Sequence, residues 1–106
     1  MSEQVALIVG HRTKPGQRDA MRAVWEEYIK PNVRDNPGHL AYYFNTVADD
    51  PDGVVAYQIF TNEAAKDAFL ASDWYPEYLE KVSVHVAEPP EITTASVVWS
   101  KQDLPV

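Results

Sequence analysis

The polar side chains of this sequence that could take part in a reaction are those of His11, His39, His85, Gln58 and the tyrosines. An imidazole titrates near neutral pH, so each histidine could move a proton to or from a bound compound. Arg12 or Arg34 could hold an anion. A surface or structural role is the competing interpretation for each histidine. Their mutual spacing matches no metal-ligand pattern on a helix or strand, and no metal site is expected.

Gln58 lies within the otherwise apolar run at residues 54–60. It precedes Phe60 by two positions, so both side chains are expected on the same face of a strand. A buried amide needs hydrogen-bond partners, which could be the backbone, another side chain or a ligand. Gln58, His39 and His11 are therefore the candidate catalytic residues.

Residues 68–78 read AFLASDWYPEY and contain the aromatic residues Phe69, Trp74, Tyr75 and Tyr78. Ordinary core packing is one interpretation, because aromatic residues contribute strongly to cores. A stacking surface for nucleic acid is the second. The third is a pocket wall that offers apolar faces and a few polar tips to an aromatic ligand.

The elements that would position these residues follow from periodicity. The apolar run at 5–9 predicts a strand with both faces buried, ended by Gly10. Apolar residues between 17 and 29 recur at helical spacing and predict an amphipathic helix, disturbed at Pro31 and finished by Asn-Pro-Gly at 36–38. Residues 39–46 and 54–60 flank a polar turn and predict a β-hairpin.

The second half of the chain is expected to hold two helical pieces and a last strand. Thr61 or Asn62 would cap a helix over 63–70, and Ser72 would cap a further piece carrying the aromatic residues. Residues 82–86 alternate as a strand would but continue a helical pattern, and the helix is favoured. The β-branched run at 92–99 predicts a strand.

The acidic loop at residues 48–53 superficially suggests a calcium site, but its register fails. Ala48 stands at the first ligand position and Ile59 at the place of the closing glutamate. A solvated hairpin turn, with Gly53 in a special backbone conformation, is the preferred interpretation.

Composition restricts the classes of partner. The chain has 106 residues, a length that suits a single domain over 1–106. Its net charge of -7 and scattered Lys and Arg argue against nucleic acid, which includes the stacking interpretation above. No apolar run is long enough to span a membrane, there is no signal-peptide pattern and no cysteine, so a cytoplasmic protein is expected.

The order strand, helix, two strands, helix, strand predicts the α+β ferredoxin-like plan, with helices on one face of an antiparallel sheet. A sheet with one solvent-exposed face should alternate apolar and polar residues along its strands, and these strands mostly do not. A second copy of the sheet is the expected cover, which makes a two-fold homodimer. The alternative is that scattered exposed apolar residues are simply tolerated.

Several short motifs, in this order, resemble the antibiotic biosynthesis monooxygenase (ABM) domain family. They are Lys-Pro-Gly at 14–16, Asn-Pro-Gly at 36–38 with Tyr42, Asp-Asp-Pro at 49–51, and Phe60 followed by Glu-Ala-Ala at 63–65. The resemblance covers about residues 5–99 and implies a dimeric α/β barrel. It further implies cofactor-independent oxygenation of phenolic or quinol compounds, haem degradation or an unassigned activity.

The chain departs from the family's pattern at the histidines. Phe69 and Trp74 stand where relatives commonly carry histidine, and Gln58 stands where many carry Glu. The haem-degrading branch uses an Asn on the first strand, a Trp at the end of the third and a His ligand on the second helix. By alignment these positions fall near Val9, Phe60 and Leu79, so all three side chains are absent here. Haem degradation by that arrangement is not expected.

Two functions are carried forward. The first is a monooxygenase of the quinol or phenol type, acting without cofactor on a small aromatic or hydrophobic compound. The second is a non-catalytic dimer that binds a small ligand or serves an accessory role, with a purely structural dimer as a further possibility. The expected ligand pocket is lined by Val9, Tyr43, Gln58, Phe60, Phe69, Trp74 and Tyr78.

Overall fold

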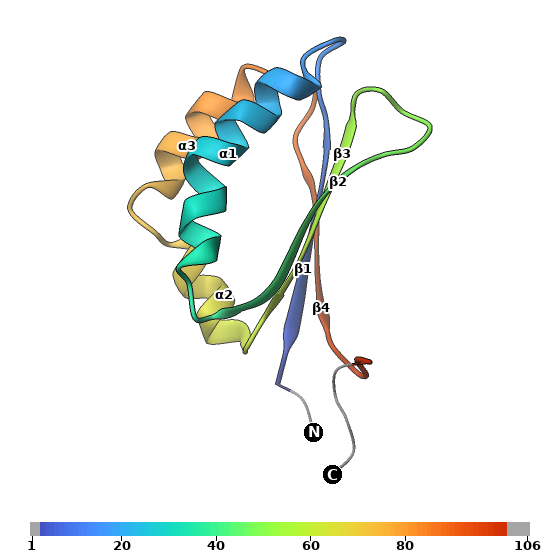
Figure 1. The fold of residues 1–106 in the computed structure, drawn as a ribbon. Helices are drawn as coiled ribbons and strands as arrows, with labels where there is room; N and C mark the ends of the chain where they lie inside the picture. Colours follow the sequence, from blue (N-terminus) through green and yellow to red (C-terminus); the bar gives the residue numbers. More distant parts are fainter. Residues whose placement is uncertain (1–2, 102–106) are drawn as a thin grey trace.

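The computed structural model describes residues 3–101 and shows an α+β fold with one sheet and one layer of helices (Figure 1). The strands are β1 (Val5–Arg12), β2 (His39–Thr46), β3 (Gly53–Phe60) and β4 (Glu91–Ser96), and the helices are α1 (Arg18–Arg34), α2 (Glu63–Leu70) and α3 (Tyr75–Ser83). The predicted ferredoxin-like order is confirmed, with the second helical region divided into α2 and α3.

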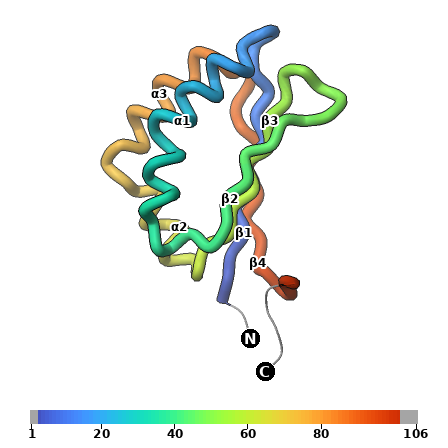
Figure 2. Tube along the Cα trace, in the orientation of Figure 1, coloured from blue at the N-terminus to red at the C-terminus, as the bar shows by residue number. Residues whose placement is uncertain are grey.

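The sheet is antiparallel with strand order β2-β3-β1-β4. Helices α1, α2 and α3 lie on one of its faces, and within residues 3–101 no helix or strand covers the other face (Figures 1 and 2). Directly opposed residues in antiparallel strands share a face. Leu7, Gln58 and Tyr42 therefore form one row across β1, β3 and β2. This row lies on the helix-covered face, where Leu7 and Gln58 are buried.

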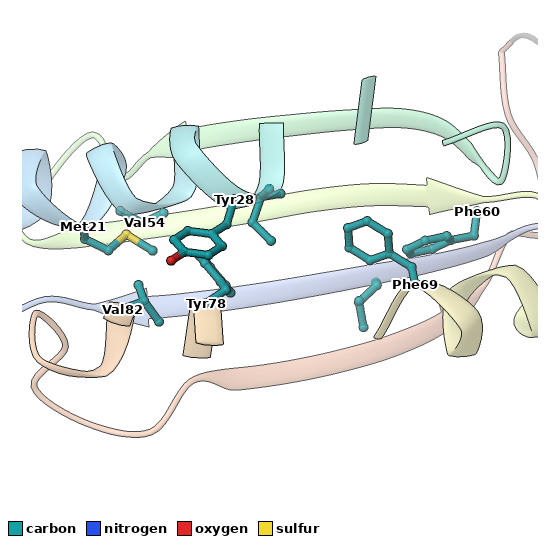
Figure 3. Packing of buried hydrophobic residues seen from close by; sticks show 9 residues of the cluster. Met21, Tyr28, Val54, Phe60, Phe69, Tyr78 and Val82 are labelled. Atoms are coloured by element: carbon teal, nitrogen blue, oxygen red, sulfur yellow. The ribbon is translucent and has the colours of Figure 1, made fainter. Parts of the chain in front are cut away.

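The core fills the space between this face and the helices. Phe60 and Phe69 lie near one another at one end of the core, and the other labelled side chains gather at the other end (Figure 3). Phe60 is fully buried. The buried cluster comprises Leu7, Met21, Tyr28, Ile29, Val54, Phe60, Phe69, Tyr78 and Val82.

The predicted ends of two strands were wrong, while the predicted end of the first helix is confirmed. Strand β1 continues through Gly10 to Arg12 because Gly10 pairs with both Val55 and Glu91. Helix α1 ends at Arg34, directly before the predicted stop at 36–38, and it continues through Pro31 because burial of Ile29 and packing of Val33 hold its last turns despite the lost backbone donor. The strand expected over 92–99 ends at Ser96.

The helix caps were predicted in part. Asn62 caps α2, with its Oδ1 accepting a hydrogen bond from Ala65 N at 2.8 Å. Ser72 does not cap α3, whose N-cap position is Trp74 and whose first turn contains proline. Helix α3 ends at Ser83, and Val86 instead forms an isolated bridge with Thr13, so the ambiguous segment is helix only at its start.

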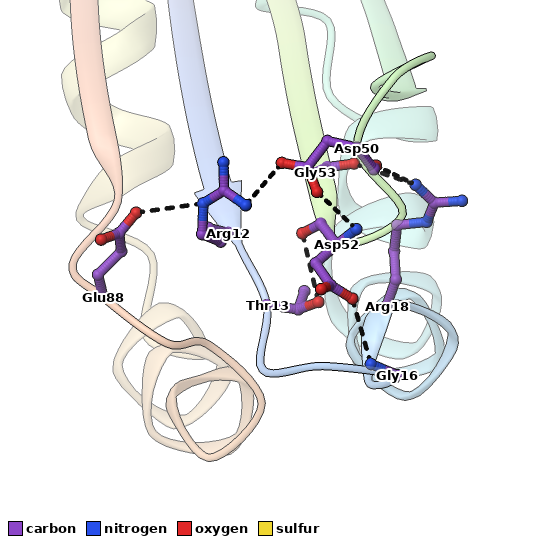
Figure 4. A network of polar contacts seen from close by, with 8 residues as sticks. All are labelled: Arg12, Thr13, Gly16, Arg18, Asp50, Asp52, Gly53 and Glu88. Carbon is purple, nitrogen blue, oxygen red and sulfur yellow. Dashed lines mark hydrogen bonds and ion pairs between the residues drawn. The ribbon is translucent and has the colours of Figure 1, made fainter.

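The turn between β2 and β3 is held by the polar network of Figure 4. Arg12 forms an ion pair with Asp50 at 2.8 Å, and Arg18 donates to the Asp50 carbonyl at 3.0 Å. The φ angle of Gly53 is not positive, so the expectation of a special backbone conformation at this glycine was wrong. Its lack of a side chain is needed for space, because a Cβ there would lie 2.8 Å from Cγ2 of Val47.

Candidate functional site

The residues predicted to line a pocket divide between the two faces of the sheet. All but Tyr43 lie on the helix-covered face or pack against its core. Tyr43 pairs with Tyr57 on the opposite face and is 58% exposed. The helix side is therefore where most of the candidate side chains gather.

The polar centre of the helix side is a pair formed by His39 and Gln58. Nε2 of His39 lies 2.8 Å from Oε1 of Gln58. Nδ1 of the same ring lies 2.9 Å from Nδ2 of Asn36. Gln58 is only 4% exposed, so its amide obtains a hydrogen bond from a side chain rather than from water.

Aromatic rings surround His39. Its centroid lies 4.1 Å from that of Phe60 and 4.6 Å from that of Phe69, which meets it edge-on. Tyr42 is the third neighbour, at 5.8 Å. Burial among these rings lowers the pKa of His39, while the hydrogen bond to Gln58 acts in the opposite direction. The imidazole is thereby favoured in its neutral form.

A group of tyrosines continues this aromatic layer. The Tyr42 hydroxyl accepts a hydrogen bond from Trp25 Nε1 at 2.9 Å. Burial raises the pKa of Tyr42 to about 12, although the bond from Trp25 lowers it. Burial also raises the pKa values of Tyr75 and Tyr78, and the neighbouring Tyr42 and Tyr75 raise that of Tyr78 further. All three phenols are therefore protonated at neutral pH.

Sequence reasoning assigned no site role to Asn36 or Trp25. It placed Tyr75 in the pocket wall of one interpretation and included Tyr42 only among the tyrosines in general and the family motifs. The hairpin register carried one usable signal, because it places Tyr42 directly opposite Gln58. Asn36 stands three residues before His39 in the connection from α1 to β2. No periodic pattern marks such a loop residue, so its contact could be found only in the folded chain.

A groove of about 330 Å³ lies beside this centre, between the end of α1 and α2. Its apolar wall includes Phe69 and Trp74, whose rings are 5.4 Å apart. Asn36 also lines it, so the residue bonded to His39 faces both the groove and the imidazole. The remaining lining is Asn32, Asp35, Pro37, Ala65, Ala68 and Ser72.

His11 is not brought together with His39. The register places His11 opposite Val54 and His39 opposite Phe60, at the two ends of β3 and about 20 Å apart. Its Nδ1 is buried without a hydrogen-bond partner, and burial lowers the pKa of its imidazole. His11 lines a groove of about 630 Å³ together with Arg12, Asp50 and Glu88.

The uncovered sheet face carries a further groove, of about 580 Å³. Its lining includes the exposed apolar side chains Leu40, Tyr43, Tyr57 and Trp99. Tyr57 is 39% exposed and Trp99 74% exposed. In the part of the chain that the structure describes, no helix is both long and apolar enough to cross a membrane.

These features define an α+β protein of ferredoxin-like topology with aromatic and polar side chains gathered between the sheet and its helices. The sequence profile described as antibiotic biosynthesis monooxygenase matches residues 5–81. The chain therefore belongs to the ABM family.

Solved structures share this fold over most of the chain. Rv0793 from Mycobacterium tuberculosis is 24% identical with a TM-score of 0.82, covering 92% of this chain and 98% of its own. Protein SO0527 from Shewanella oneidensis is 26% identical with a TM-score of 0.79, covering 90% and 91%. A candidate antibiotic biosynthesis monooxygenase from Nitrosomonas europaea is 19% identical with a TM-score of 0.83, covering 93% and 94%.

A curated relative is the uncharacterized protein sll1783 from Synechocystis, which is 26% identical over 87 residues. The match covers 81% of this chain and 58% of the relative. This chain thus spans little more than half the length of that protein.

The departures from the family's pattern have a visible structural counterpart. Phe69 stands at a position where the resemblance leads one to expect histidine, yet an imidazole is still present beside it, contributed by His39. Leu79, which the resemblance was expected to place near the haem ligand of the degrading branch, is 44% exposed on α3. The imidazole of this site thus comes from β2 rather than from a helix.

Proposed function

We propose that this protein is a cofactor-independent monooxygenase of the quinol or phenol type, acting on a small aromatic or hydrophobic compound. The observation that carries the proposal is the His39–Gln58 pair, enclosed by aromatic rings and adjoining the groove at Phe69 and Trp74. Membership of the ABM family supports the same reaction class.

The reaction needs no protein redox group, because the substrate supplies the electrons. A ring carbon that carries hydrogen becomes a carbonyl, one oxygen atom of O₂ enters the product, and the second leaves as water. The protein would bind and orient the ring against aromatic walls and hold the oxygen of its phenolate through hydrogen bonds. Hydrogen bonds to charged oxygens are stronger than neutral ones, so they favour the reactive anion.

The proposed enzyme is a homodimer whose two sheets pack face to face. The exposed Tyr43, Tyr57 and Trp99 on and beside the uncovered face support this arrangement, because such a patch is costly to leave in water. The helix-side groove lies on the opposite side of the sheet and is left free by the dimer.

The second candidate function is a non-catalytic dimer that binds a small ligand. It is favoured by one observation: both ring nitrogens of His39 already have side-chain partners, Asn36 and Gln58. An imidazole engaged on both sides is not free to remove a proton from a substrate.

Oxygen uptake separates the two functions. The protein is incubated with a panel of quinols and phenols while dissolved oxygen is recorded and binding is measured by calorimetry. Uptake that depends on both protein and substrate, with a product heavier by one oxygen and lighter by two hydrogens, is expected. Tight binding of panel members without uptake would reject the monooxygenase and favour the binding protein.

A further inference from the structure

The groove between the end of α1 and α2 carries charge of one sign. Nine of the described residues line it, and none of these nine is a lysine, an arginine or a histidine. Asp35 supplies a carboxylate to the lining. Within residues 3–101 this carboxylate has no ion-pair or hydrogen-bond partner. The groove therefore holds a negative charge that no neighbouring side chain offsets.

Other polar side chains of the lining add hydrogen-bond acceptors. Nδ2 of Asn32 donates to a backbone carbonyl of α1 at 2.6 Å, so the remaining polar atom of this amide, Oδ1, can only accept. The Ser72 hydroxyl donates to a backbone carbonyl of α2 at 3.5 Å, and its oxygen keeps its lone pairs. The amide of Asn36 is already engaged at both ends, by Gly38 and His39. A ligand in the groove thus meets acceptors that need a donor.

Two helices end beside the groove. Asp35 occupies the C-cap position of α1, and Ser72 follows Ala71, the C-cap residue of α2. The C-terminal end of a helix carries a partial negative charge that favours a cation close to its last turn. Helix α2 has no basic residue in its last turn. The two helix ends therefore add to the negative charge of the Asp35 carboxylate.

Basic residues near the groove are exposed or already paired. Arg34, in the last turn of α1, is exposed and does not line the groove. On α2, Nζ of Lys66 lies 3.3 Å from a carboxylate oxygen of Asp67 and 3.8 Å from one of Glu63. Asp73 lies between two lining residues in the sequence and adds a further acidic side chain. The surroundings thus retain their negative character.

The apolar wall suits the body of an organic cation. The ring centroids of Phe69 and Trp74 are 5.4 Å apart, with an angle of 72° between the ring planes. Trp74 is half-buried and lines the groove, so part of its indole ring is accessible to a ligand. The face of an indole attracts a cation more strongly than that of a phenol or phenyl ring. The volume of about 330 Å³ is sufficient for a small organic molecule.

We propose that this groove binds a small organic cation, with an ammonium group held by Asp35 and Trp74 on an aromatic body that packs against Phe69. The inference rests on the proposed function for the ligand's being a substrate, and it deepens that function by naming the substrate class. The class is a phenol or quinol that carries an alkylammonium side chain. An anionic side chain would instead lie beside the Asp35 carboxylate, and such a like-charge contact is costly.

Three probes with the same ring system separate charge from shape. Tryptamine carries an ammonium group, indole-3-ethanol a neutral hydroxyl and indole-3-propionate a carboxylate. Calorimetry at pH 7 and low salt is expected to show that tryptamine binds about tenfold more tightly than the alcohol, through one ion pair and one cation–π contact. The propionate should bind more weakly than the alcohol. Equal affinities, a preference for the propionate or no binding of tryptamine would overturn the proposal.

The place of binding is tested by NMR titration of the unaltered protein with tryptamine. The side-chain amide of Asn32 and the indole N–H of Trp74 line the groove, and both signals are expected to shift. The side-chain amide of Gln17, which precedes α1 at its other end and is bonded to His85, should not shift. Shifts confined to residues outside the groove would refute the assignment.

Variants connect the preference for a cation to the residues named. Asp35→Asn should lower the affinity for tryptamine about tenfold, to that of the alcohol, and leave the affinity for the alcohol unchanged. Asp19→Asn removes the same charge about 24 Å away along α1 and is the matched control. Trp74→Leu should weaken binding of both probes. A preference undiminished in Asp35→Asn, a preference lost in Asp19→Asn or affinities unchanged in Trp74→Leu would contradict the proposal.

Binding of these probes is measured without turnover, so the two proposals fail separately. A protein that binds tryptamine in the groove and takes up no oxygen with the phenol panel would lose its monooxygenase assignment and keep the cation site. Oxygen uptake with phenols by a protein that does not prefer tryptamine would reject the cation site and keep the monooxygenase.

Discussion

Nε2 of His39 lies 2.8 Å from Oε1 of Gln58, which joins the first residue of β2 to a buried position in β3. His39 is paired with Phe60 between β2 and β3, so its ring extends along β3 to Gln58, which lies two positions before Phe60. Each side chain thereby supplies a hydrogen bond that water cannot easily replace.

Removing the His39 imidazole should show that Gln58 depends on this hydrogen bond. His39→Leu is expected to lower the free energy of unfolding by about 1–3 kcal/mol, because the Gln58 amide loses a partner in a buried setting. Urea unfolding followed by circular dichroism measures the change. The double variant His39→Leu/Gln58→Leu should lose less than the sum of the single losses. Strict additivity would mean that the two residues do not depend on one another.

His11 should make stability depend on pH. Burial lowers the folded-state pKa of its imidazole, so the unfolded chain binds more protons below about pH 6.5. Stability from this source is present above that pH and is lost as the pH falls toward the folded-state value. His11→Leu should flatten this decline in urea unfolding between pH 5 and 7.5.

His11→Leu should also remove the cost of the unpaired Nδ1 and leave stability at pH 7 equal or higher by about 1 kcal/mol. His85→Leu is the matched comparison, because that ring is bonded to Gln17 at 2.8 Å and its removal should destabilise. A large loss of stability in His11→Leu at pH 7 would contradict the unpaired state of the nitrogen.

The turn between β2 and β3 should reject any side chain at position 53. Gly53→Ala places its Cβ 2.8 Å from Cγ2 of Val47 and is expected to destabilise the protein by about 1–3 kcal/mol. Gly10→Ala is the matched control, since the nearest atom to its Cβ is at 3.9 Å. Thermal unfolding of the two variants measures the difference, and equal losses would disprove the close approach.

The proposed dimer should depend on the uncovered sheet face. Sedimentation at micromolar concentration is expected to give twice the 12.0 kDa of one chain. Tyr57→Lys should shift this mass to that of a monomer, because it places a charge in the apolar face opposite Tyr43. Leu79→Lys, on α3, serves as the control and should remain dimeric. A monomeric mass for the unaltered protein would refute the dimer.

Local chemistry explains which elements could be predicted. The hairpin was predicted because two β-branched and aromatic runs flank a polar turn, and α2 because Asn62 can cap it. The end of α1 was predicted from Asn-Pro-Gly at 36–38, but its continuation through Pro31 was not, since the cost of Pro31 is local while the burial of Ile29 that offsets it is tertiary.

By itself, the sequence determined the class of fold, the order of its elements and the family, because periodicity, turns and short motifs are properties of neighbouring residues. Tertiary structure decided which side chains meet. Asn36, His39 and Gln58 form one chain of hydrogen bonds only because the loop after α1 and the registry of β2 with β3 bring them together. The same folding placed Tyr43 on the other face of the sheet, since alternation along β2 separates it from Tyr42.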